Sequence, residues 1–223
     1  MITSTATSTL MTEDADLLTL TQWLSPVFPV GGYAYSHGLE TAIAAEDVTN
    51  AVELTEWLRV VLEFGGGQAD AVLLTSAMKT DADHAALNDW ASALAASSER
   101  WQETYEQGSA FVRAANAITG QDYDAMALPV AVGRAAAKLS VPAERVASLY
   151  LQALISNLAT GAVRHIPLGQ AEGQRVIAKL QEVVLAVAKR SVEMAPEDIR
   201  GAAFGADMAA LKHETQEVRI FRT

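Results

Sequence analysis

The stretch from Ser140 to His165 reads SVPAERVASLYLQALISNLATGAVRH, and it decides the fold class more clearly than any other part of the chain. Ser140, Pro142 and Glu144 form a typical start signal for a helix. The residues that follow are apolar on most sides of a helix, so we expect this helix to be central and buried. Elsewhere, too, apolar residues recur at helical spacing, and alternating β-branched runs are scarce.

Helix signals continue on both sides of this stretch. Asn50 and Glu53 suit a capping box before the apolar face of residues 54–62. Gly65–Gly67 should end that helix, because glycine adopts the left-handed conformation cheaply. Further apolar stripes lie at 87–95, at 101–115 before Gly120, and at 176–187. We therefore predict one all-α domain of roughly eight to ten packed helices over residues 13–211, after a flexible lead-in at 1–12 and before a tail at 212–223.

Composition narrows the class of protein. The chain has 223 residues, is 50% hydrophobic, lacks cysteine and carries a net charge of −11. The absence of cysteine excludes disulfides, Cys-ligated metals and a Cys nucleophile. The negative charge disfavours nucleic-acid partners and anionic membranes. The first dozen residues do not have the pattern of a signal peptide, and the apolar stretches are interrupted by polar residues, so we expect a soluble cytoplasmic protein.

Catalytic and cofactor motifs are missing from the sequence. It contains no phosphate-binding P-loop, no GxSxG nucleophile turn and no HExxH zinc pair. The four histidines are far apart: His37, His84, His165 and His213. We interpret each as a surface or core histidine rather than a metal ligand, and the scattered Asp and Glu as solvated residues on polar helix faces. The prediction is therefore no catalytic site, no metal and no cofactor.

Three segments remain unusual. Ser25–Glu40, SPVFPVGGYAYSHGLE, is either a tight helix connection or a functional turn, since aromatic and polar residues share it with prolines and glycines. Arg164–Arg175, RHIPLGQAEGQR, is a second such junction that either only connects helices or faces a partner. Lys212–Thr223, KHETQEVRIFRT, is either a frayed terminus or a segment that orders on a partner.

Together these segments resemble the UreF family of urease accessory proteins. The first is close to that family's SPxxPVGxxxYSxGLE pattern, Leu154–Arg175 to SNLxxxAVRxxPLGQxxGQ, and the tail to HExxxxRLFRS. SERWQETYEQG and LPVAVGRAAAKLSVP also fit the middle of the family. The order of these motifs covers the chain from about Leu17 onward. Two departures are His37, where glutamine is common, and Tyr33, where phenylalanine is common.

The resemblance implies a function that composition does not. UreF proteins are all-helical, usually dimeric and not enzymes. They bind UreD (also called UreH), and the GTPase UreG docks on that pair to deliver nickel to the urease apoprotein in a GTP-dependent way. The resemblance therefore implies a scaffold role, a homodimer, and these partner-binding residues: Pro29, Gly31, Gly32, Tyr35, Ser36, Gly38, Glu40, Arg164, Gln170, Gln174, His213, Glu214, Arg219, Phe221 and Arg222. The alternatives are a helical metal-binding protein or an adaptor unrelated to urease.

Overall fold

The computed structural model describes residues 3–223, with side chains from residue 12 onward. Over this range the chain forms α-helices and two 3-10 helices and no strand, which confirms the all-α single domain. The α-helices are α1 (Thr3–Trp23), α2 (Leu39–Ala44), α3 (Ala51–Phe64), α4 (Gly66–Ala77), α5 (His84–Leu94), α6 (Ser98–Thr119), α7 (Leu128–Ala136), α8 (Ala143–Ala162), α9 (Gln170–Lys179), α10 (Gln181–Glu193) and α11 (Phe204–His213). The 3-10 helices are η1 (Gly32–Ala34) and η2 (Pro196–Asp198).

The core is built around α4 and α8. As expected, α8 is buried along much of its length, including Leu151 and Ile155, which are fully enclosed. In α4, every residue from Ala71 to Ala77 is buried. Helices α3, α5, α7, α8 and α10 all pack against it. A helix buried on all sides has no polar face, so periodicity gives little signal for it.

A side-chain cap and small residues set the two ends of α3. Asn50 caps α3 as predicted, because its Oδ1 accepts hydrogen bonds from the N–H groups of Val52 and Glu53 at 2.9 and 3.1 Å. Helix α3 does end at Phe64, but the left-handed conformation expected there is wrong, since Gly65 has φ −123°. Small size matters instead: a Cβ on Gly67 would lie 2.8 Å from Leu62 Cα.

Two further boundaries differ in detail from the sequence interpretation. The stripe at 176–187 is divided between α9 and α10, with the break at Leu180. Helix α11 ends at His213, two residues into the predicted tail. Helix α1 begins at Thr3, within the 1–12 segment, and the flexibility of that segment stays a prediction. Among residues 3–223 no helix is both long and apolar enough to cross a bilayer.

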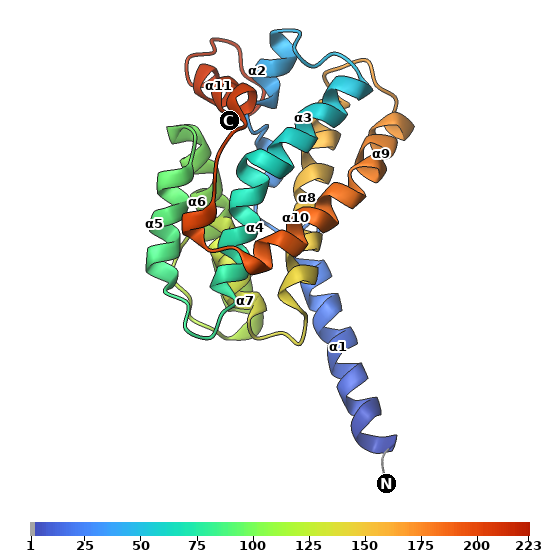
Figure 1. Ribbon diagram of the computed structural model, residues 1–223, viewed down its shortest axis with the longest axis vertical. Coiled ribbons are helices and arrows are strands. Elements are labelled where there is room, and N and C mark those ends of the chain that lie inside the picture. The colour runs from blue at the N-terminus through green and yellow to red at the C-terminus, as the bar shows by residue number, and fades with distance from the viewer. Residues whose placement is uncertain (1–2) are drawn as a thin grey trace.

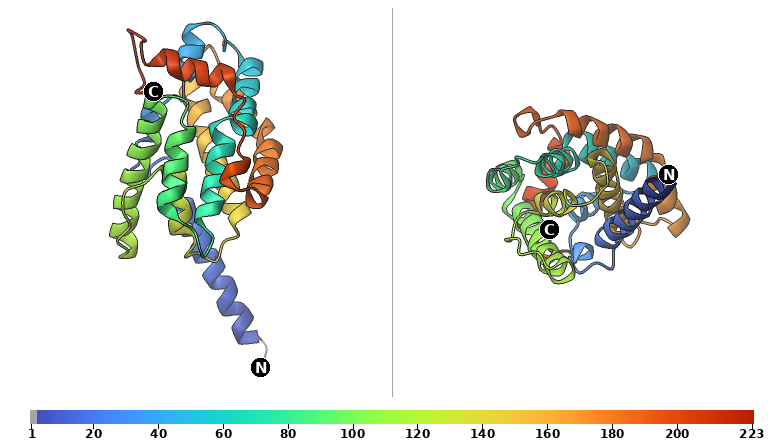
Figure 2. Two further views of the ribbon diagram at one scale, coloured as in Figure 1. Left: turned by 60° about the vertical axis from the view of Figure 1, so that its left-hand side comes forward. Right: turned by 90° about the horizontal axis from the view of Figure 1, so that it is seen from below.

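Elements from both halves of the sequence meet at one end of the bundle. Helices α2 and α11 lie there beside the start of α6, and residue 223 lies between them (Figure 1). Helix α1 projects from the opposite end of the bundle. The side view in Figure 2 shows the same arrangement, with the chain end at the top of α6 and under α11. The candidate site is at this end.

Candidate functional site

The tail lies against the first unusual segment of its own chain. The backbone N–H of Arg222 donates to the carbonyl oxygen of Ala34 at 2.8 Å, and the N–H of Ser36 donates to the main-chain oxygen of Thr223 at 2.8 Å. The Ser36 hydroxyl donates to the same oxygen at 2.5 Å and accepts from the N–H of Glu40 at 3.2 Å. Two segments at opposite ends of the sequence therefore pair through backbone hydrogen bonds and form one short strip.

Glu40 anchors the tail through its carboxylate. The side chain is buried. Its two oxygens accept hydrogen bonds from the backbone N–H groups of Ile220 and Phe221 at 2.7 and 2.9 Å. His213 Nε2 lies 3.1 Å from the same carboxylate. The first turn of α2 thus supplies the acceptors that the tail backbone, which is in neither helix nor sheet, requires.

His213 links this anchor to α6. Its Nδ1 lies 2.7 Å from Glu99 Oε2, and Glu99 Oε1 accepts from Arg219 Nη1 at 2.6 Å. Arg219 also donates to the carbonyl oxygen of Glu214 at 2.6 Å. Glu214 in turn accepts from the N–H and hydroxyl of Ser98, and these bonds lower the pKa of its carboxyl. The start of α6 and the tail are therefore joined by alternating charges.

A second polar group surrounds Arg222. The Tyr35 hydroxyl donates to Glu106 Oε2 at 2.7 Å, and Arg222 Nη1 lies 2.7 Å from the same oxygen. The Arg222 guanidinium also lies 5.4 Å from the centre of the Tyr35 ring. Burial and the Glu106 carboxylate raise the pKa of Tyr35, whereas the Tyr35 hydrogen bond is the main cause that lowers the pKa of Glu106. These contacts are partly exposed, so each adds little by itself.

Phe221 packs towards the end of α8. Its ring meets His165 edge-on at a centroid distance of 5.3 Å. A Cβ on Gly161 would lie 3.5 Å from the same ring. The second unusual segment therefore reaches the site through His165. Its predicted site residues, Arg164, Gln170 and Gln174, are exposed and take no part in the tail contacts described above.

The turn before α2 is shaped by unusual backbone. Gly31 and Gly38 have φ of 72° and 78°, and His37 has φ of 62° although it carries a side chain. Asn157 on α8 holds the turn by donating to the carbonyl oxygen of Gly32 at 2.8 Å. Pro29 is exposed at the edge of the turn. The predicted functional turn is thus a folded element that presents residues 34–40 to the tail.

A buried charge cluster lies beneath this turn. Glu103 forms ion pairs with Arg100 and with His37, whose Nδ1 is 3.1 Å away, and it accepts from the Thr223 hydroxyl at 2.6 Å. Burial alone would raise the pKa of Glu103, but Arg100 and His37 outweigh it and lower that pKa well below its ordinary value. Thr223 thereby ties the tail to the interior of the molecule.

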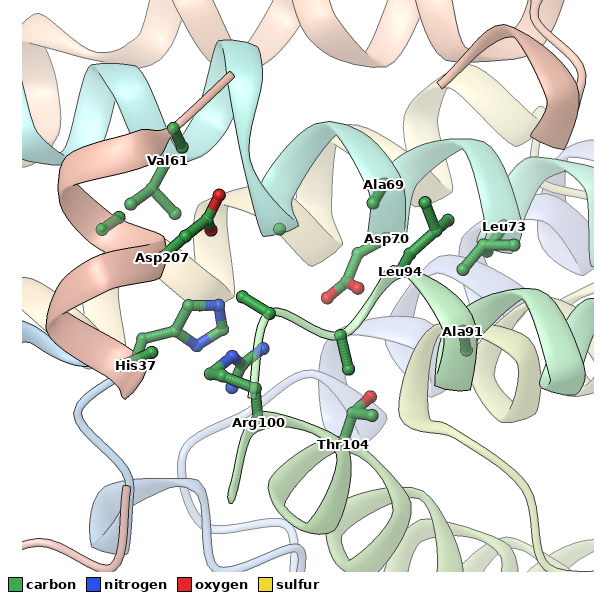
Figure 3. Close-up of a pocket in the computed structure, with 16 residues that line it drawn as sticks. His37, Val61, Ala69, Asp70, Leu73, Ala91, Leu94, Arg100, Thr104 and Asp207 are labelled. Atoms are coloured by element: carbon green, nitrogen blue, oxygen red, sulfur yellow. The ribbon is translucent and has the colours of Figure 1, made fainter. Parts of the chain in front are cut away.

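A pocket lies beside this cluster, and two more acids line it. Asp70 and Asp207 lie around the pocket with His37 and Arg100 (Figure 3). Burial raises the pKa of both carboxyl groups, and Asp70 also accepts from the Tyr150 hydroxyl at 2.7 Å. Within the described part of the chain, no three His, Asp or Glu side chains meet in a group that could hold a metal ion.

Sequence reasoning missed several of the acids that build this site. The family resemblance included Glu40 and Glu214. The other Asp and Glu were placed on solvated faces, yet Glu103 is buried and Asp70 faces the pocket. One signal was available: Glu99, Glu103 and Glu106 recur at spacings of four and three, so one face of α6 carries three carboxylates. Arg219 and Arg222 of the tail pair with the first and the last of them.

Comparisons with known proteins show the family of the chain. The UreF family model matches residues 48–181. The chain is 51% identical to the urease accessory protein UreF of Jannaschia sp. (strain CCS1), covering 93% of this chain and 94% of that one. It is 49% identical to that of Cereibacter sphaeroides (strain ATCC 17025), covering 93% and 98%, and 48% identical to that of Paracoccus denitrificans, covering 96% and 100%. Similarity of this extent makes the chain a member of the UreF family of urease accessory proteins, with a role in urease maturation.

Proposed function

We propose that this chain is a non-catalytic scaffold in GTP-dependent nickel insertion into the urease apoprotein. In this proposal it acts in the cytoplasm, binds UreD (UreH), and bridges it to the GTPase UreG. It needs no cofactor of its own and binds neither nucleic acid nor membrane. The proposal draws its partners from the family to which the chain belongs.

One observation carries the proposal: the tail is held in a fixed position with apolar side chains facing out. Val218 is 79% and Ile220 68% exposed, although the tail backbone beside them is anchored to Glu40. Exposed β-branched residues on an ordered segment lose little further entropy when a partner covers them. Phe221 is half-buried against His165, and Arg222 is exposed but paired with Glu106, so both hold the segment in place.

The test is a pull-down of UreD, and of UreG through it, by tail variants. Deletion of residues 214–223 should abolish capture while the helical bundle still melts cooperatively. Ile220→Ser should weaken capture without a change in melting temperature, because its side chain faces solvent. Phe221→Ala should weaken capture and also loosen the tail. Val52→Ser, at an equally exposed residue on α3, is the matched control. Full capture by the deletion variant would overturn the docking role.

The homodimer belongs to the same proposal. Phe204, Met208 and Leu211 form one exposed stripe along α11, with exposed fractions of 75, 51 and 43%. Lys212 is exposed beside them, and Asp207 of the same helix is half-buried and lines the pocket with His37 and Arg100. Two copies that each carry a charge of −11 repel one another least where exposed acids are few, and a single apolar stripe can pair with itself across a two-fold axis. We therefore place the dimer contact on α11.

A further inference from the structure

The imidazole of His213 lies between two carboxylates. The side chain is completely buried. Its Nδ1 is 2.7 Å from Glu99 Oε2 and its Nε2 is 3.1 Å from Glu40 Oε2. These are hydrogen-bond distances at both ring nitrogens. A neutral imidazole has one N–H donor, whereas an imidazolium has two.

The other partners of the two carboxylates indicate where the proton is. Glu40 accepts two backbone N–H groups from the tail, and Glu99 accepts from Arg219. Both carboxyl groups are thus already surrounded by donors, as acceptor-only carboxylates require. Ionised carboxylates only accept hydrogen bonds, so both contacts with His213 require a ring N–H. Both contacts are hydrogen bonds only when His213 is an imidazolium.

We propose that His213 is a positioning residue which, as an imidazolium, bridges Glu40 and Glu99 and so holds the tail in its docked position. Loss of the Nε2 proton would leave a lone pair facing the buried Glu40 carboxylate, and repulsion would turn that carboxylate away. The N–H groups of Ile220 and Phe221 would then lose their acceptors. The exposed pair Val218 and Ile220 is therefore presented to a partner only while His213 holds both protons.

The surroundings of the ring contain few other charges. Glu40 faces it from α2, Glu99 from α6, and Arg219 of the tail reaches Glu99. Helix α3 meets α11 through the apolar side chains of Trp57 and Val61. On α11 itself, the neighbouring Lys212 is exposed. Directly after the helix, Glu214 is hydrogen-bonded to Ser98. The charges at the bridge thus come from one imidazolium, one arginine and two carboxylates.

The test uses the isolated full-length chain, labelled with 15N at histidine. Nitrogen spectra distinguish imidazolium from either neutral tautomer, and His213→Gln assigns the signal. Amide hydrogen exchange at Ile220 and Phe221 then reports tail docking over a range of pH. We expect an imidazolium at neutral pH, and exchange that becomes at least about tenfold faster as the ring loses its proton. His213→Gln should exchange fast at every pH, while His84→Gln, on α5, should match the wild type.

A second variant separates the proton from mere packing. In Glu40→Gln an amide nitrogen in the place of Oε2 can donate to Nε2 of a neutral ring, while the amide oxygen in the place of Oε1 still accepts from Ile220. The pH dependence of exchange at Ile220 should therefore flatten, whereas Phe221 loses its acceptor and should exchange fast at every pH. A neutral tautomer beside protected tail amides, or unchanged protection in His213→Gln, would overturn the proposal. The importance of the bridge for UreD capture rests on the proposed function. If the bridge behaves as described but the wild type captures no UreD, the proposed function fails and the bridge stands.

Discussion

Replacement of Gly38 by alanine tests how closely the turn and α11 are packed. Gly38 has φ of +78°, and a Cβ there would lie 2.7 Å from the backbone nitrogen of Ala210. The left-handed backbone costs a residue with a Cβ about 1–2 kcal/mol. Overlap with a helix backbone that cannot rotate away adds about 1–3 kcal/mol. We therefore expect Gly38→Ala to lower the free energy of unfolding by about 2–5 kcal/mol in total.

Gly31 provides the matched control. It has φ of +72°, yet none of the described atoms lies within 4 Å of its added Cβ. Gly31→Ala should therefore show the backbone cost alone, about 1–2 kcal/mol. The difference between the two variants isolates the contact between the turn and α11.

Chemical denaturation of both variants measures this difference, and thermal melts give a second reading at about 2–4 °C per kcal/mol for a chain of this size. Gly38→Ala should also speed amide exchange at Ile220 and Phe221, because Glu40 follows the glycine on α2. Equal destabilisation by the two variants would refute the packing argument. Destabilisation by neither would refute the backbone argument as well.

Three shorter predictions concern the interior and the dimer. Glu103→Gln should cost about 3 kcal/mol at neutral pH because Arg100 loses its buried partner; since the folded pKa is lowered, the deficit relative to wild type should shrink as pH falls below the ordinary value of 4.5 in denaturation series. Asp70→Asn should remove a decrease in stability that wild type shows as pH rises above 3.8, because the folded pKa is raised, and parallel pH curves would contradict this. Met208→Glu should shift light scattering from dimer to monomer, whereas Leu185→Glu, at an exposed residue of α10, should not.

Much of the fold was readable from the sequence because its signals are local. The cap at Asn50 and the stop at Gly120 depend on residues within one turn, and both helix ends lie where the signals predict. The enclosure of α4 was not readable, since its burial comes from five neighbouring helices. The break at Leu180 was hidden for a related reason: the apolar stripe continues across it, as Ile177 and Val184 are both buried.

The site, like the fold, could be predicted only in part from the sequence. Motifs singled out Tyr35, Ser36 and Phe221, which line one small pocket. The contacts of Glu106 with Tyr35 and of Glu99 with His213 could not be placed from the sequence, because a carboxylate on a helix has the same local pattern whether it faces water or a distant segment. Long-range charge pairing is decided by topology, and one sequence shows topology only weakly.

The pairing of Ser36 with Thr223 spans 187 residues. Closing a loop of that length carries a large entropic cost that is recovered only after the intervening helices have packed, so this contact belongs to the last stage of folding. During synthesis the strip cannot form until residue 223 has left the ribosome. A partner that reads the docked tail therefore selects chains that have folded after synthesis of this segment, and half-folded copies are left out of the assembly.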